Sequence, residues 1–383
     1  MRKLSSILIL FFVLFRPSFA QDIEKFDPEK EKDLLDLIST EQKDQLISAL
    51  QDAAGNYKEL AFAIRKVDKE KREDCVWLIL NMPHLDRLAI TSQILVEHID
   101  YAYRSLKVFK YEVPKDLFKE FNLTYRISEE PVSAYRKILF EKFFPLVKDE
   151  TNPSNTAKTV NEWIKDNITL REKEFFGEVL PPLLILKGKK GTEEEISILT
   201  TAILKSIGIP SRRAKVRYFG GQKGGASWVE VYEKGRWLPL YPLNPESFGD
   251  FHKYEKEKPL NITLVSTTSA FKKNLVTENY TQVGKLKLYL AWEEKPAIGF
   301  KHFSVNVFND GCLSPLDDLS SECEDEECAT DSAGFFEAAL GDGIYYVETG
   351  VRDSTGNVFV NIQKIEIKPQ ETLELKMEIS PED

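Results

Sequence analysis

Residues 191–212 read GTEEEISILTTAILKSIGIPSR, and this segment predicts a helix with a clear start and end. Thr192 is a suitable N-cap, and the three glutamates after it stabilise the first helical turn. The apolar run that follows extends the expected helix to Ile207. Three strand-like segments follow, RRAKVRYF, SWVEVYE and RWLPLYP. A helix followed by several antiparallel strands predicts an α+β fold.

Four short segments keep a fixed order and spacing in this part of the chain. They are GTEEEIS (191–197), GIPSR (208–212), ASWVEV (226–231) and WLPLYP (237–242). They resemble the transglutaminase-like superfamily, whose members carry G-x-C-x-E-x-A, G-I-P-A-R, H-A-W-V-E-V and W-x-x-x-D-P. NEWIKDNITL (161–170) also resembles the family's lead-in helix and strand. The resemblance covers roughly residues 155–245 and implies a papain-like α+β core.

The resemblance also implies a catalytic cysteine, histidine and aspartate, which would form a thioester from an amide and pass on the acyl group. In this sequence those three positions are Glu193, Ala226 and Tyr241. A carboxylate cannot form the thioester, and alanine cannot transfer a proton. The sequence therefore predicts no thiol-based acyl transfer, and none of its residues is assigned a catalytic role.

The neighbouring sequence does not restore the missing groups. No cysteine occurs between Cys75 and Cys312, and no histidine occurs between His98 and His252. We interpret the glutamates after Thr192 as helix-stabilising residues, and we expect a tyrosine ring to fill space beside position 226. The alternative makes the first glutamate a general base or metal ligand. The candidate binding residues are Glu193, Trp228 and Tyr241.

The flanking regions predict two further domains around a transglutaminase-like domain at residues 151–282. Residues 21–150 show helical spacing of apolar residues and predict an α-helical domain. Residues 283–383 contain short alternating runs separated by turn residues, which predicts an antiparallel, immunoglobulin-like β-sandwich. The glycine-rich segment 220–225 is interpreted as a flexible connection.

The N-terminus predicts export. Two basic residues precede an apolar run, and Ser18-Phe19-Ala20 is a typical cleavage sequence, so residues 1–20 are interpreted as a cleaved signal peptide. Cleavage changes the formal charge from −10 to −13. Such an acidic chain is not expected to bind nucleic acid, because phosphate binding needs a basic surface. We therefore expect a secreted or periplasmic protein without a membrane span.

The sequence predicts no cofactor and only weak metal sites. Cys75 lies in an apolar helical segment and is interpreted as an inert thiol. The acidic segment 317–327 is interpreted as a solvated loop, with calcium binding as the alternative. The calcium candidates are Asp317, Asp318 and Asp325. The disulfide candidates are Cys312, Cys323 and Cys328, two of which would pair in an oxidising compartment.

Three functions remain open from the sequence. The leading one is a non-catalytic binding or scaffold module whose partner is an extracytoplasmic protein, peptide or glycan. The second is an exported amide hydrolase or acyltransferase that uses non-standard catalytic residues. The third is a structural envelope component in which the acidic loop binds calcium. A fold resemblance alone does not choose among them.

Overall fold

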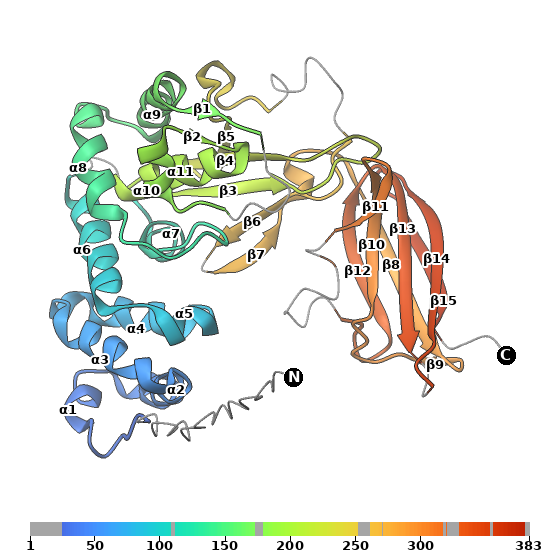
Figure 1. Ribbon diagram of the computed structural model, residues 1–383, viewed down its shortest axis with the longest axis horizontal. Coiled ribbons are helices and arrows are strands. Elements are labelled where there is room, and N and C mark those ends of the chain that lie inside the picture. The colour runs from blue at the N-terminus through green and yellow to red at the C-terminus, as the bar shows by residue number, and fades with distance from the viewer. Residues whose placement is uncertain are drawn as a thin grey trace, which may run out of the picture.

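The computed structural model describes residues 25–108, 112–172, 179–251, 261–269, 271–316, 319, 329–352 and 355–379. Along the chain it has a helical part, a central part with helices against a sheet, and two C-terminal sheets (Figure 1). The predicted mixed α+β class is confirmed. The predicted signal peptide, residues 1–20, lies outside the described residues.

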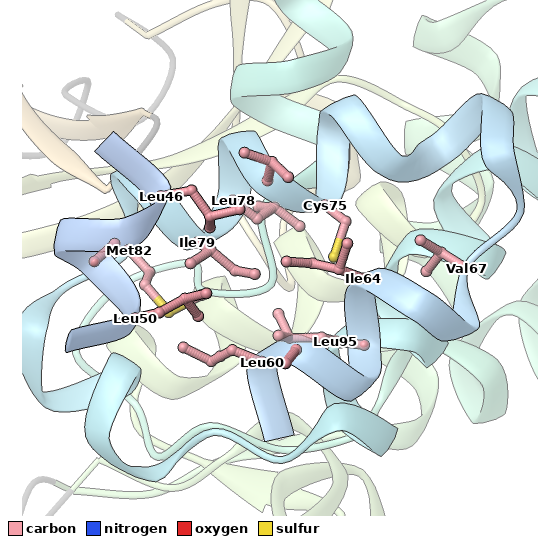
Figure 2. Packing of buried hydrophobic residues seen from close by; sticks show 14 of the residues in the cluster. Leu46, Leu50, Leu60, Ile64, Val67, Cys75, Leu78, Ile79, Met82 and Leu95 are labelled. Carbon is pink, nitrogen blue, oxygen red and sulfur yellow. The ribbon is translucent and has the colours of Figure 1, made fainter. Parts of the chain in front are cut away.

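The N-terminal part consists of short helices around one apolar core (Figure 2). Apolar residues recur at helical spacing: in α3, Tyr57, Leu60 and Ile64 are buried on one face. Cys75 is buried in the same core, and burial raises the pKa of its thiol to about 12, as expected for an inert thiol. The helices are α1 (Lys32–Leu35), α2 (Thr40–Asp52), α3 (Tyr57–Lys66), α4 (Arg72–Asn81), α5 (His84–Ala89), α6 (Ser92–Val108), α7 (Lys115–Leu117) and a π-helical turn at Phe118–Leu123.

In the central part, four helices pack around a second core and against a five-stranded sheet. The helices are α8 (Arg136–Val147), α9 (Pro153–Asn167), α10 (Pro182–Gly188) and α11 (Glu193–Ser206). The sheet has the order β5-β4-β3-β6-β7. Its strands are β3 (Ser211–Val216), β4 (Ala226–Glu233), β5 (Arg236–Leu240), β6 (Ser266–Ser269) and β7 (Lys272–Leu275). A short parallel pair, β1 (Thr169–Leu170) with β2 (Lys190–Gly191), precedes α11.

Helix α8 belongs to the central core, although it lies inside the predicted helical domain, 21–150. Its residues Leu139, Phe143 and Val147 are buried in the second core, and the helix packs against α11. The first core ends at Tyr125 and the second begins at Ile127. Helix α8 therefore packs against the helices of the central part and also contacts α6 of the N-terminal part.

The two C-terminal sheets enclose a third apolar core. One has the order β11-β10-β13-β14, and the other has the order β12-β8-β15 with β9 beside β8. Inward residues alternate along each strand, for example Leu286, Leu288 and Leu290. The strands are β8 (Val283–Trp292), β9 (Lys295–Pro296), β10 (Phe303–Asn309), β11 (Cys312–Pro315), β12 (Phe335–Gly341), β13 (Gly343–Arg352), β14 (Val358–Ile367) and β15 (Thr372–Glu378).

One strand pair departs from the antiparallel arrangement that the sequence predicts. β15 pairs with β8 in parallel, whereas the other pairs of these two sheets are antiparallel. The chain crosses from β14 to the second sheet at the start of β8, where Gln370 N donates to Val283 O at 2.8 Å and Lys285 N donates to Glu371 O at 2.8 Å. β15 therefore runs in the same direction as β8.

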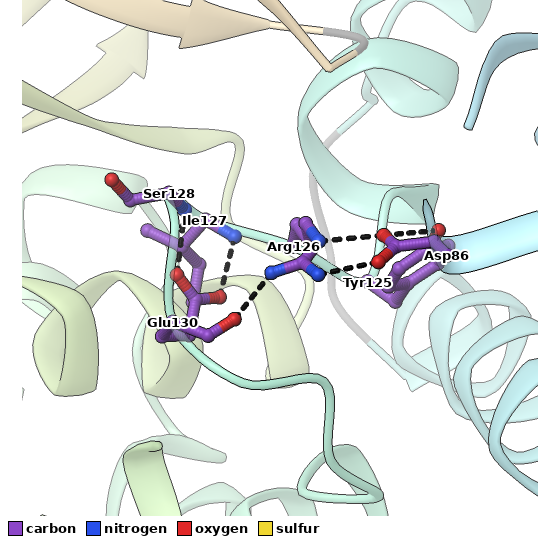
Figure 3. Close-up of polar contacts among 6 residues, drawn as sticks. All are labelled: Asp86, Tyr125, Arg126, Ile127, Ser128 and Glu130. Atoms are coloured by element: carbon purple, nitrogen blue, oxygen red, sulfur yellow. Dashed lines mark hydrogen bonds and ion pairs between the residues drawn. The ribbon is translucent and has the colours of Figure 1, made fainter. Parts of the chain in front are cut away.

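A buried polar cluster joins the helical part to the central part (Figure 3). Asp86 of α5 accepts hydrogen bonds from Tyr125 Oη at 2.8 Å and from Arg126 Nε at 2.6 Å, and Arg126 Nη2 donates to its second oxygen. Arg126 Nη1 donates to the backbone oxygen of Glu130. The Glu130 carboxylate accepts from two backbone N–H groups, those of Ile127 at 2.9 Å and Ser128 at 2.7 Å. The cluster holds the non-helical segment between the first two cores.

Beside this cluster lies a buried histidine, His98, that is hydrogen-bonded to no carboxylate among the described residues. Arg136 Nε donates to His98 Nδ1 at 3.2 Å, so the ring proton is on Nε2, which donates to Ser133 O at 3.0 Å. Burial, and then the Arg136 charge, lowers the pKa of His98 well below its usual value, and Lys205 of α11 acts in the same direction. The folded protein thus holds this imidazole neutral.

Because His98 is held neutral in the folded protein, we expect the free energy of unfolding to fall in mild acid. Below pH 6.5 the unfolded chain binds a proton at His98 that the folded chain does not bind, so the free energy of unfolding falls as the pH decreases. The slope is at most about 1.4 kcal/mol per pH unit below pH 6.5, so the loss is compared between pH 6.5 and pH 5. His98→Gln keeps an acceptor and a donor but does not titrate. Urea unfolding at both pH values should show a smaller loss in this variant, and an equal loss would contradict the assignment.

Candidate functional site

The site is built around the start of α11, where the sequence-predicted cap is confirmed. Thr192 Oγ1 accepts from Glu195 N at 3.2 Å, and Glu195 Oε2 accepts from Thr192 N at 2.8 Å, which is a reciprocal capping box. Arg171 Nη2 donates to Glu195 Oε1 at 2.7 Å, and Leu180 N donates to the same oxygen at 3.1 Å. The buried glutamate therefore fixes the helix start and the two segments that approach it.

The helix also ends where the sequence predicts. Gly208 has a φ of +91°, a conformation that favours glycine, and its N–H donates to Lys205 O at 3.2 Å. Ile209 N donates to Leu204 O at 2.9 Å. This C-terminal turn leads the chain directly into β3, which lies next to β4 in the sheet. In this arrangement the first residue of α11, Glu193, and the first residue of β4, Ala226, line the same groove.

A groove of about 660 Å³ opens at this end of α11. Glu193 and Ala226, at the positions of the family's cysteine and histidine, both line it. The groove is lined by charged side chains of both signs and by several apolar side chains. Its lining includes Leu170, Arg171, Glu172, Val179, Thr192, Glu194, Arg213, Lys215, Arg217, Tyr218, Gly224, Gly225 and Ser227.

The third position of the triad lies outside the groove lining. Tyr241 is 1% exposed and Trp228 is 0% exposed, and their ring centroids are 5.9 Å apart. Both belong to one aromatic cluster with Phe251 and Tyr280, and Ala226 is part of the same cluster. Tyr241 is thus enclosed in the same apolar cluster as Ala226 and does not face solvent. Because both rings are enclosed, Glu193 alone of the three predicted binding residues reaches the groove.

A buried ion pair next to the aromatic cluster was missed by the sequence analysis. Glu230 of β4 accepts from Arg212 Nε and from Tyr280 Oη, and Trp228 Nε1 donates to Tyr280 Oη at 3.0 Å. Burial and the Glu230 charge raise the pKa of Tyr280 well above its usual value. Arg212 also lies over the Trp237 ring, 4.2 Å from its centroid. Arg212 and Glu230 are directly opposite in the β3–β4 register, a pairing that two separate strand predictions do not provide.

The basic wall of the groove was also missed, although its signal is present in the sequence. Arg213, Lys215 and Arg217 alternate along RRAKVR and all line the groove. Alternation places them on one face of β3 and the segment that follows it. Arg213 Nη1 donates to Glu194 Oε1, so this wall is tied to the first turn of α11. The groove is therefore lined by acidic and basic side chains and not by a thiol and an imidazole.

Ser227 is the hydroxyl closest in sequence to the former histidine position, and it shows no sign of activation. Its Oγ is buried and has no hydrogen-bond partner among the described residues. Its backbone oxygen accepts from Ser197 Oγ at 3.0 Å. A serine nucleophile needs a hydrogen-bonded base, so this arrangement does not supply one.

Other predicted site residues fall partly or wholly outside the described residues. Asp317, Asp318 and Asp325 are among these, so the calcium prediction stays a prediction. Cys312 is exposed at the start of β11, while its candidate partners Cys323 and Cys328 are not described. Within the described ranges, no group of three His, Cys, Asp or Glu residues is arranged to hold a metal ion. No described helix combines the length and apolarity needed to cross a bilayer.

Comparison with known families identifies the central part. Residues 143–242 match the model of the transglutaminase-like superfamily. This region is a transglutaminase-like domain. The match begins within α8 and ends one residue after Tyr241, so it includes α11 and all three former triad positions. The resemblance read from the sequence is thereby confirmed.

Solved structures share weaker similarity with the chain. A candidate cysteine protease from Cytophaga hutchinsonii is 11% identical with a TM-score of 0.25, and the match covers 37% of this chain and 47% of that one. A candidate protease from Parabacteroides distasonis is 13% identical with a TM-score of 0.27, covering 61% and 50%. The chain thus spans about half the length of each, and no curated protein matches it. The assignment of the transglutaminase-like domain therefore depends on the family match.

Proposed function

We propose that the chain is an exported, non-catalytic protein whose transglutaminase-like domain binds a ligand in the groove at α11. One observation carries this proposal: the groove is present, yet the positions for the nucleophile and base are Glu193 and Ala226, and the position for the acid is enclosed in an aromatic cluster. The described lining contains neither cysteine nor histidine. Thioester chemistry needs both a thiolate and a proton carrier.

A peptide segment of an extracytoplasmic partner is the ligand that suits this groove best. Leu170 and Val179 offer apolar contacts, while Lys215, Arg217 and Glu193 offer charges of both signs. An extended polypeptide presents apolar and charged side chains in turn, so it matches such a lining. The immunoglobulin-like arrangement that we propose for the C-terminal sheets would supply a second contact surface.

The first test is enzymatic, and we expect no turnover. The chain without residues 1–20 is incubated with glutamine peptides to measure ammonia release, peptide cleavage and incorporation of a fluorescent amine. We expect rates equal to those of Glu193→Ala, because a carboxylate at this position cannot form a thioester. Iodoacetamide should also have no effect. Turnover that disappears in Glu193→Ala would instead favour the alternative, an amide hydrolase or acyltransferase with unusual catalytic residues.

The second test measures binding with a random-sequence peptide library. Peptides retained by the chain should lose at least roughly tenfold in affinity in Leu170→Arg and Arg217→Glu, which change an apolar and a basic residue of the groove lining. Leu275→Arg is the matched control, because Leu275 is an exposed leucine on β7 that does not line the groove. Equal affinity in all four proteins would contradict binding at this groove.

A further inference from the structure

One rim of the groove is formed by a loop in which four of six residues are glycine. The glycine-rich segment 220–225 joins β3 to β4, and Gly224 and Gly225 line the groove. At Gly225 a Cβ atom would lie 2.1 Å from Val216 O, so a side chain does not fit there. Gly221 and Gly224 have φ values of +67° and +82°, which favour glycine. Such a loop gains little from side-chain packing and loses much conformational freedom on ordering.

The loop is nevertheless held by hydrogen bonds, in contrast to the flexible connection that the sequence predicts. Phe219 N donates to Gly224 O at 2.9 Å, which closes the loop on itself. Gly220 N donates to Asn261 O at 2.9 Å, and Gly221 N donates to Phe308 O at 3.0 Å. Phe308 belongs to β10, so one of these bonds comes from the C-terminal sheets. Figure 1 shows the β3–β4 connection reaching the end of these sheets.

Asn309, the last residue of β10, contributes most of the remaining bonds. Its side chain is almost fully buried, with 4% exposure. Asn309 Nδ2 donates to Phe219 O at 2.9 Å, to Gly224 O at 3.2 Å and to Gln222 O, and Asn309 Oδ1 accepts from Gly224 N at 3.2 Å. A single amide thus binds both ends and the middle of the loop. Because three carbonyl oxygens face Asn309 Nδ2, this position requires a hydrogen-bond donor.

We propose that the groove is a composite site, in which the C-terminal sheets position its glycine-rich rim through Asn309. Asn309 is a positioning residue: it does not line the groove, but it holds Gly224, which does. Any effect of this positioning on ligand binding rests on the proposed function, whereas the positioning of the rim by Asn309 does not. A ligand seated against Tyr218 and Gly224 strengthens the contact between the two parts of the chain, because binding and ordering of the rim are coupled.

Amide hydrogen exchange of the full chain without residues 1–20 tests this role without any ligand. In Asn309→Ala, the amides of residues 219–225 should exchange roughly tenfold faster than in the unchanged protein, because the loop loses its hydrogen bonds to the Asn309 side chain. Asn306→Ala is the matched control. Asn306 is also a buried asparagine of β10, but its amide bonds to Ser304 and Tyr346 within the C-terminal sheets. Equal exchange in Asn309→Ala and the unchanged protein, or equal acceleration in both variants, would overturn the proposal.

Asn309→Asp separates hydrogen bonding from packing, because it keeps the shape of the side chain. A carboxylate accepts from Gly224 N but cannot donate, and it would face the carbonyl oxygens of Phe219 and Gly224. We expect exchange at least as fast as in Asn309→Ala. Exchange as slow as in the unchanged protein would show that the amide does not hold the loop.

The unchanged protein provides a measurement that does not depend on a variant folding. In low concentrations of denaturant, the amides of Gly221 and Gly224 should be protected and should open together with those of β10. Unprotected exchange at these glycines would show that Asn309 does not hold the loop in place. None of these measurements uses a ligand. Failure of the peptide screen would therefore contradict the proposed function, whereas unchanged exchange in Asn309→Ala would contradict the positioning role of Asn309.

Discussion

Asp86→Ala should lower the free energy of unfolding by about 3–5 kcal/mol, one of the two largest effects that we expect for a single substitution. Asp86 is 4% exposed and accepts from Tyr125 Oη and from two nitrogens of Arg126. Its removal leaves a guanidinium and a phenol without their acceptor in a site that water hardly reaches. The cluster also holds the segment between the first two cores, so both are affected.

Urea unfolding followed by circular dichroism measures this effect. Asp86→Asn should lose less than Asp86→Ala, because the amide oxygen still accepts one hydrogen bond. Asp52→Ala is the control: this carboxylate is 3.7 Å from Arg87 and largely exposed, and its loss should change stability by less than about 1 kcal/mol. Similar values for Asp86→Ala and Asp52→Ala would show that the buried cluster contributes no more than a surface pair.

Glu230→Ala should lower the free energy of unfolding by a similar amount, about 3–5 kcal/mol. Glu230 is 1% exposed, and its two oxygens accept from Arg212 Nε and Tyr280 Oη. Without it, the buried Arg212 charge remains over the Trp237 ring with its carboxylate partner removed. The hydroxyl of Tyr280 loses its acceptor at the same time, and this hydroxyl also accepts from Trp228.

The same unfolding experiment includes two comparisons. Glu230→Gln keeps an acceptor but not the charge, so about 1–3 kcal/mol should be lost. Glu337→Ala is the control on another strand, because its ion pair with Lys285 is about half exposed. We expect a change below about 1 kcal/mol there. A loss in Glu230→Ala no larger than in Glu337→Ala would mean that the ion pair does not stabilise the sheet.

The aromatic cluster around Trp228 encloses two of the three positions that the sequence aligns with the family's catalytic residues. In this chain, the acid position is Tyr241, which packs with Trp228 and Phe251 in the same cluster. The small side chain of Ala226 adds to this apolar packing. The replacements therefore favour burial of aromatic surface, which stabilises the sheet.

Much of the site was predictable because its determinants lie close together in the sequence. The capping box involves Thr192 and Glu195, which are three residues apart, and Gly208 ends the same helix. Alternation along RRAKVR places three basic residues on one face, although the sequence analysis did not use this signal. By contrast, Trp228 and Tyr241 were predicted to bind a ligand because motif spacing does not show that their rings are enclosed.

The amino-acid order by itself determined that α11 starts at Thr192, that strands follow it, and that positions 193, 226 and 241 lack a thiol, an imidazole and a carboxylate in the right places. These properties depend on residue identity and on neighbours within a few positions. Only the tertiary structure decided that Tyr241 is enclosed and that Asn309 binds a loop 90 residues earlier in the chain. Such contacts depend on how sheets and helices pack, because packing brings together residues whose separation in sequence carries no local signal.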